Sequence, residues 1–125
     1  MNPRVAVTAG TVAGAIAVMF GAFGAHALRA VLDEHALATW HTAVEYQFWH
    51  ALALIATGLL ARDRASNAAR VAAGAFIVGI VLFCGSLYLL ALDAPRGFGV
   101  ITPLGGIAFI AGWLALALHA WRNGG

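Results

Sequence analysis

The chain has 125 residues, of which 62% are hydrophobic and only 10% are charged, and its mean hydropathy is +0.88. Soluble domains carry about 25% charged residues, so this composition excludes an ordinary soluble enzyme and a disordered chain. The basic balance comes from seven scattered arginines without any lysine, which excludes the basic stripe of a nucleic-acid-binding protein. We therefore expect a small integral membrane protein with a single all-α domain over residues 1–125.

Four apolar segments are long enough to cross a hydrocarbon core of about 30 Å, which takes roughly 20 residues of helix. In chain order they cover about residues 5–27, 42–61, 71–92 and 103–121. We expect a four-helix transmembrane bundle, with polar turns at 62–67 and 93–97. Ser66 is a suitable cap for the third helix. Thr102 followed by Pro103 is typical of a cap and the first residue of the fourth helix.

The segment between the first two spans, residues 28–41, mixes charged residues with apolar residues at helical spacing. This pattern predicts a short amphipathic segment in the membrane interface. The alternative is an N-terminal extension of the second span. Asp33 is a suitable cap for either helix.

The arginines predict how the chain is oriented in the membrane. With four spans, both termini and the turn at 62–70 lie on one side, which carries five of the seven arginines: Arg4, Arg62, Arg64, Arg70 and Arg122. Cytoplasmic loops are enriched in basic residues, so we expect a bacterial inner-membrane protein with both termini in the cytoplasm. Trp40 and Trp121 would be aromatic anchors at opposite interfaces. A signal peptide cleaved at 25–27 is the alternative, but the apolar run is longer than the roughly 7–15 residues typical of one.

Small residues recur at four-residue spacing within the predicted spans. In lipid, such residues let helix backbones approach closely. The glycines expected in helix packing are Gly10, Gly14, Gly21, Gly79, Gly105 and Gly112. These faces are expected to form the interior of the bundle. The alternative is that one GxxxG face, such as that of Gly10 and Gly14, forms a dimer.

Polar side chains gather near the ends of the spans that are opposite to the termini. The candidate cluster consists of His26, Glu45, Tyr46, Gln47, His50, Ser86, Tyr88 and Thr102. Glu45 is the only acidic residue inside a span, and it must find a partner, such as Arg29 or Arg96, or take up a proton. The cluster either ties helices together or binds a small polar ligand, a lipid headgroup or an ion. A proton relay, and haem ligation by His26 and His50, are further alternatives.

Four sequence blocks, one in each span, carry a resemblance to a known family. They are GAFGAHAL at 21–28, TAVEYQFWHALAL at 42–54, LFCGSLYLL at 82–90, and ITPLGG at 101–106 with Gly112 and Trp113 after it. Together they resemble the YgdD-like family of small bacterial inner-membrane proteins, a family of unknown function. The resemblance implies four spans and an inner-membrane location, and it implies no activity.

We find no catalytic, nucleotide-binding or zinc-binding motif in the sequence, and the single Cys84 cannot form an internal disulfide. We therefore expect a non-enzymatic protein, either an accessory subunit or a binder of a lipid or small amphiphile, with the polar cluster in the non-cytoplasmic leaflet as its site. We expect no cofactor, no metal and no nucleic acid. The expected partners are the lipid bilayer and either a larger membrane complex or a homo-oligomer. The alternatives are an oligomeric transporter or channel and a haem- or quinone-binding redox protein.

Overall fold

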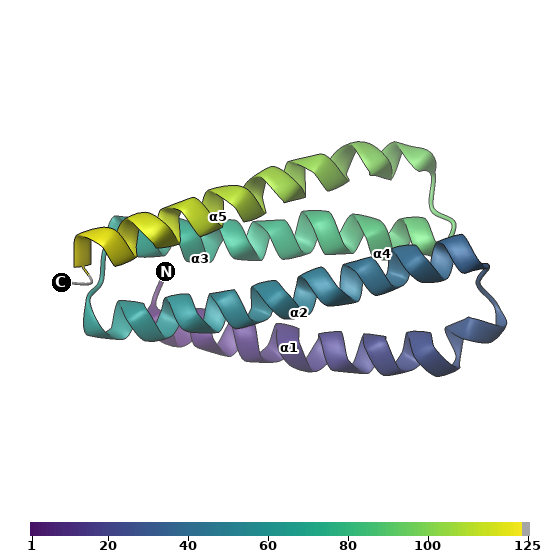
Figure 1. Cartoon of the computed structure of the whole chain (residues 1–125), viewed down its shortest axis with the longest axis horizontal. Helices are drawn as coiled ribbons and strands as arrows, with labels where there is room; N and C mark the ends of the chain where they lie inside the picture. Colours follow the sequence, from purple (N-terminus) through teal and green to yellow (C-terminus); the bar gives the residue numbers. More distant parts are fainter. Residues whose placement is uncertain (124–125) are drawn as a thin grey trace.

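The computed structural model describes residues 1–123, which form helices joined by short connections. The elements are α1 (Pro3–His26), η1 (Leu28–Ala30), α2 (Glu34–Asp63), α3 (Asn67–Gly79), η2 (Ile80–Cys84), α4 (Gly85–Ala91), η3 (Arg96–Val100) and α5 (Ile101–Asn123). They make four long rods that lie side by side, each antiparallel to the next (Figure 1). Both termini and the α2–α3 connection lie at one end, here called the terminal end, and the other two connections lie at the loop end. The prediction of an all-α fold is confirmed.

Local sequence signals begin three of the four rods. The side chains of Asn2, Asp33 and Ser66 accept hydrogen bonds from backbone N–H groups in the first turns of α1, α2 and α3, at 2.8, 2.8 and 3.0 Å. Such caps satisfy N–H groups that have no partner within the helix. The predicted caps at Asp33 and Ser66 are confirmed.

The predicted cap of the fourth helix at Thr102 is wrong. The helix α5 begins at Ile101, directly after the 3₁₀-helix η3, so Thr102 already lies inside the helix. The backbone is helical from Arg96 onward, and therefore no extended capping residue precedes Pro103. The Thr102 hydroxyl contacts a neighbouring helix instead.

Residues 28–41 do not form a separate amphipathic helix. Residues 28–30 form the short turn η1, and 34–41 are the first turns of α2, as in the alternative prediction of an N-terminal extension. Trp40 in this extension is only 4% exposed, and its Nε1 donates to Phe20 O at 2.9 Å. Its predicted place as an interfacial anchor is therefore wrong, whereas Trp121 is 88% exposed.

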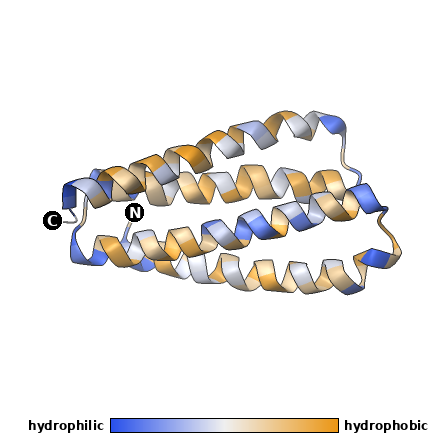
Figure 2. Cartoon of the chain, viewed as in Figure 1, coloured by the Kyte–Doolittle hydropathy of each residue, from blue (hydrophilic) through white to orange (hydrophobic). Residues whose placement is uncertain are grey.

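Large apolar side chains cover the outside of the packed helices, and small residues fill the inside. Nine of the 15 buried hydrophobic residues are alanines, so the helix backbones lie close together. Valine, leucine and isoleucine side chains on α1, α3 and α5 are widely exposed, among them Val18, Val71 and Ile110. Hydrophilic residues are concentrated at the two ends and along α2 (Figure 2). Apolar outer faces of this kind suit contact with lipid rather than water.

Three of the four rods are long and apolar enough to cross a membrane: Pro3–Ala30, Asn67–Ala91 and Arg96–Asn123. They correspond to the predicted first, third and fourth spans. The helix α2 is longer but less apolar, because Glu45, Gln47 and His50 lie in its middle. Three of the four predicted spans thus have the length and apolar composition that a membrane crossing requires.

The small-residue face of α1 packs against α2. A Cβ atom added to Gly10 would lie 2.9 Å from Ala51 O, and one added to Gly21 would lie 3.3 Å from Val44 Cγ1. Gly14 has more room, with Ala51 Cβ at 3.9 Å. The GxxxG pair is thus occupied within the chain, and this face is not free to form a dimer.

The other predicted packing glycines lie where α5 crosses the third rod. Gly79 faces Phe109, and a Cβ added to Gly112 would lie 2.7 Å from Phe76 Cε1. A Cβ added to Gly105 would overlap the backbone of Phe83, within the π-helical turn η2. A π turn is a local departure from the α-helix, and here it coincides with the closest helix crossing. A side chain at position 105 would push the two rods apart.

Candidate functional site

The helix α2 supplies most of the polar side chains inside the molecule. It packs against α1 and against the third rod, α3–η2–α4. Its residues Gln47, His50 and Thr57 are 4%, 5% and 1% exposed. A buried polar group costs free energy unless it is hydrogen bonded. Within residues 1–123, every buried side-chain nitrogen and oxygen has a partner.

Gln47 joins three rods through its side-chain amide. Its Nε2 donates to Ala13 O of α1 at 2.8 Å, and its Oε1 accepts from Tyr88 Oη of α4 at 2.7 Å. These two bonds define the orientation of the amide, since one atom must donate and the other must accept. The Tyr88 ring also packs edge-on against Phe20 of α1, with ring centroids 5.0 Å apart. This contact holds α1, α2 and α4 in register.

His50 links α2 to α5, and its hydrogen bonds determine its tautomer. Nδ1 lies 2.6 Å from Tyr46 O, which can only accept, so Nδ1 carries the proton. Nε2 then accepts from Trp113 Nε1 at 3.1 Å. The ring also stacks on Phe109 at a centroid distance of 3.6 Å. The imidazole is therefore neutral, and both of its nitrogens are engaged within the chain.

Ser86 and Thr102 form a third contact, between α4 and α5. Ser86 Oγ donates to Phe83 O at 3.0 Å, and the Thr102 hydroxyl donates to Ser86 Oγ. Cys84 is also fully buried nearby in the chain. The polar side chains are thus used in pairs to connect neighbouring helices.

The predicted cluster is therefore not one site. Gln47 pairs with Tyr88 and Ser86 pairs with Thr102, whereas His26 and Glu45 are exposed on the outside. The predicted partners of Glu45 are not found, because residues 1–123 provide it with neither a hydrogen bond nor an ion pair. The ring of Tyr46 belongs to the aromatic interior, with its centroid 4.6 Å from that of Phe83.

His26 and His50 lie far apart, so they do not form a ligand pair for haem. His26 is the last residue of α1, whereas the Gln47 bond to Ala13 places this part of α2 beside the middle of α1. The thirteen helical residues from Ala13 to His26 correspond to roughly 20 Å along the axis of α1, so the two histidines are separated by at least this distance.

Sequence reasoning did not identify two members of the hydrogen-bond network, Trp113 and His119. Trp113 donates to His50, and His119 lies only 3% exposed at the terminal end. Ser66 Oγ accepts from Ala69 N and also forms a hydrogen bond with His119 Nδ1 at 2.6 Å. A tryptophan or histidine within a predicted span was the available signal, because each needs a partner when buried.

A groove runs along α1 on the side of the third rod, here called the α1 groove. It has a volume of about 590 Å³ and an almost entirely apolar lining: Arg4, Val5, Thr8, Ala9, Val12, Ala13, Ile16, Gln47 and Ile80. Arg4 lies at the terminal end, and Gln47 lies at the deeper end. The groove therefore extends along about 18 Å of helix, from Arg4 past the Gln47 amide beside Ala13 to Ile16.

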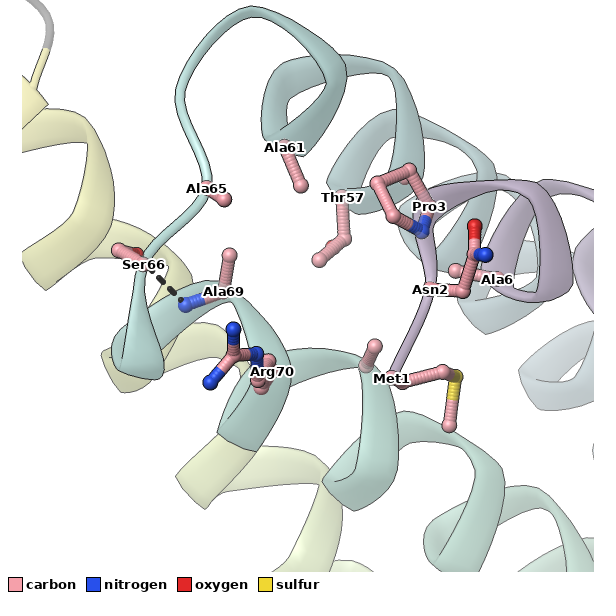
Figure 3. Close-up of a pocket in the computed structure, with 12 residues that line it drawn as sticks. Met1, Asn2, Pro3, Ala6, Thr57, Ala61, Ala65, Ser66, Ala69 and Arg70 are labelled. Atoms are coloured by element: carbon pink, nitrogen blue, oxygen red, sulfur yellow. Dashed lines mark hydrogen bonds between the residues drawn. The ribbon is translucent and has the colours of Figure 1, made fainter.

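Two further hollows lie at the terminal end, and one of them adjoins the α1 groove. One, of about 610 Å³, shares Arg4 and Thr8 with the groove and adds Arg62. The other, of about 360 Å³, lies between the start of α1, the end of α2 and the first turns of α3 (Figure 3). Arg70 forms part of its wall. The three arginines make this end suitable for an anion.

Comparisons with known proteins place the chain in a family. A family model described as "Protein of unknown function (DUF423)" matches residues 20–106. The UPF0382 membrane protein YwdK of Bacillus subtilis is 40% identical over 119 residues, which are 94% of this chain and 96% of the relative. The UPF0382 inner membrane protein YgdD of Escherichia coli is 35% identical over 122 residues, 98% of this chain and 93% of the relative. No solved structure matches the chain. The resemblance predicted from the four blocks is confirmed, and the chain belongs to the DUF423 family of proteins of unknown function.

Proposed function

We propose that the chain is a four-span protein of the bacterial inner membrane, with α2 as the second span. The helix α2 is less apolar than its neighbours, but its inward polar residues Gln47 and His50 are hydrogen bonded to adjacent helices. Lipid therefore does not meet these two side chains. Close contacts along the α1–α2 pair, from Gly24 beside Trp40 to Gly58 beside Val7, support a common membrane crossing.

We further propose that both termini lie in the cytoplasm. Five arginines lie in or beside the elements of the terminal end: Arg4, Arg62, Arg64, Arg70 and Arg122. Arg29 and Arg96 lie at the loop end. This imbalance has the sign of the positive-inside rule. The α1 groove would then open from the cytoplasmic surface into the inner leaflet.

The proposed activity is the non-enzymatic binding of an anionic amphiphile in the α1 groove. The observation that carries this proposal is the order of the lining residues, with Arg4 at the membrane surface and apolar side chains beyond it. An anionic headgroup would lie by Arg4 and Arg62, and an acyl chain would cover the exposed Val5 and Val12. Each basic residue near a membrane surface contributes about 1 kcal/mol to the binding of an anionic lipid.

This site shares only Gln47 with the predicted polar cluster. The inward members of that cluster already hydrogen bond to one another, so they support helix packing rather than ligand binding. The same pairing gives less support to the alternative of a transporter or channel, which needs polar groups free to face a permeating solute. The engaged nitrogens of His50 give less support to the haem-binding alternative.

A pair of groove variants tests the proposal. Val12 and Val18 lie on the same helix and are 52% and 62% exposed, but only Val12 lines the groove. We expect Val12→Trp to weaken the binding of spin-labelled palmitate at least about tenfold, which is 1.4 kcal/mol, because the indole fills the groove. Val18→Trp is the matched control. The measurement is the immobilised fraction of palmitate by electron paramagnetic resonance, with the protein in phosphatidylcholine nanodiscs.

A second arm tests the headgroup position. Arg4→Gln should weaken palmitate binding roughly fivefold, as expected for the loss of about 1 kcal/mol. Arg122→Gln, near the same end but outside the hollows described here, should have a smaller effect. Equal losses in Val12→Trp and Val18→Trp, or no saturable binding at all, would contradict the proposal.

A further inference from the structure

The outward face of α2 carries ionisable side chains that the rest of the chain leaves without partners. His41, Glu45 and Trp49 are exposed and follow one another at four-residue spacing, so they form one stripe on the helix. This stripe is called the α2 outer face. Among residues 1–123, no hydrogen bond or ion pair reaches the side chains of these three residues. The stripe therefore offers a free carboxylate, a free imidazole and a free indole N–H.

The position of Glu45 along the rods places it below the membrane surface in the four-span arrangement. Its neighbour Val44 packs beside Gly21 of α1. Gly21 is six residues from Ala27, where the apolar run of α1 ends, which corresponds to about 9 Å. Met19, at a similar level of α1, is 59% exposed and apolar. A carboxylate in these surroundings requires a partner that lipid tails do not provide.

The outer faces of α1 and α5 do not present an unpaired charge within the proposed membrane spans. The exposed side chains of α5 within its span are apolar, among them Leu104, Ile107, Ile110 and Leu114. The GxxxG face of α1 is already occupied by α2. The α2 outer face is thus the surface on which a partner would satisfy an otherwise unpaired charge.

We propose that the α2 outer face binds a second copy of this chain. Its acid and its base lie one helical turn apart, so the surface is complementary to itself. Two copies inserted in the same direction and related by a twofold axis along the membrane normal bring their α2 helices together in parallel. Each residue then meets partner residues within about one turn of its own level. Glu45 of each copy accepts a hydrogen bond from the partner's His41, and the contact occurs twice.

This contact goes beyond amphiphile binding and lies on a different surface from the α1 groove. It depends on α2 crossing the membrane, but not on occupancy of the groove. Val12→Trp should therefore form the dimer normally. Loss of palmitate binding and loss of the dimer are separate observations.

Cysteine cross-linking of the full chain in bacterial membranes tests the interface. In a Cys84→Ala background, Leu52→Cys places a thiol on the α2 outer face, two turns beyond Glu45, where Leu52 is 51% exposed. Leu114→Cys, at a residue that is 66% exposed on α5, is the matched control. We expect mild oxidation to produce a covalent dimer with Leu52→Cys and not with Leu114→Cys. Equal cross-linking at the two positions, or none at position 52, overturns the proposal.

Exchange of the two ionisable residues tests the pairing itself. We expect Glu45→Ala and His41→Ala each to weaken dimerisation at least about tenfold in a fluorescence energy-transfer assay in vesicles. The double variant His41→Glu/Glu45→His keeps an acid and a base on the same face, and it should restore the dimer. Both side chains are exposed, so the variants should retain the fold, which circular dichroism checks. A dimer unchanged by Glu45→Ala, or Glu45-dependent cross-linking to another protein instead, overturns the proposal.

Discussion

The inner and outer faces of α2 use similar residue types in opposite ways. On the inner face, Gln47 bonds to α1 and α4, and His50 bonds to α5 and to the Tyr46 carbonyl of α2 itself, so both side chains are satisfied within the chain. On the outer face, His41 and Glu45 have no partner among residues 1–123. A polar residue within an apolar sequence therefore does not identify a binding site by itself. The presence or absence of partners distinguishes a residue that stabilises the fold from one that is available for recognition.

The largest expected effect concerns the closest contact inside the molecule. Gly105→Ala should destabilise the protein by about 2–3 kcal/mol, as overpacking does, because its Cβ would overlap the Phe83 backbone, which cannot move aside. Gly106→Ala is the control, since its Cβ would meet only the Phe83 ring at 3.9 Å. It should be neutral or stabilising by up to about 1 kcal/mol, through helix propensity. Denaturation in detergent, followed by circular dichroism, measures both. Similar values for the two variants would show that the helix crossing has room for a Cβ atom at position 105.

A smaller effect is expected from the inner polar network. Gln47→Leu should cost about 1–2 kcal/mol, because it leaves the half-buried Tyr88 hydroxyl without its acceptor. Tyr88→Phe should cost less, since it removes the unsatisfied group as well. In a double-mutant cycle we expect a coupling of about 0.6 kcal/mol and up to about 1.7 kcal/mol, as for other interhelical hydrogen bonds in membranes. Strictly additive effects would contradict a direct bond.

The smallest effect on folding is expected at the outer face. Glu45→Ala should change the stability of the dilute, monomeric chain in detergent by less than about 0.5 kcal/mol, the usual range for an exposed site. The same detergent denaturation measures it, at a protein concentration at which size-exclusion chromatography shows a monomer. A loss comparable to that of Gln47→Leu would mean that Glu45 has a partner within its own chain. Polar side chains on both faces of α2 would then have partners within the chain, and the two faces would not differ.

Local signals in the sequence predicted the elements well. Three apolar runs became three membrane-length helices, because hydropathy over about 20 residues depends on composition alone. The caps at Asp33 and Ser66 were predictable because each bonds to an N–H group three residues away. The predicted cap at Thr102 was wrong because the preceding turn η3 is already helical, so the backbone N–H groups of the first turn of α5 do not need a capping side chain at that position.

The candidate sites depended on information that no local pattern contains. Gln47 bonds to a carbonyl 34 residues away and His50 to an indole 63 residues away. Each residue turns a helix by about 100°, so Glu45 and Gln47, only two positions apart, point in very different directions. The sequence by itself determined that α2 carries polar residues in its middle. Only the packing of α1, α4 and α5 around α2 decided which of them are satisfied inside and which face outward, because the bonds of Gln47 to Ala13 and Tyr88 and of His50 to Trp113 all come from other helices.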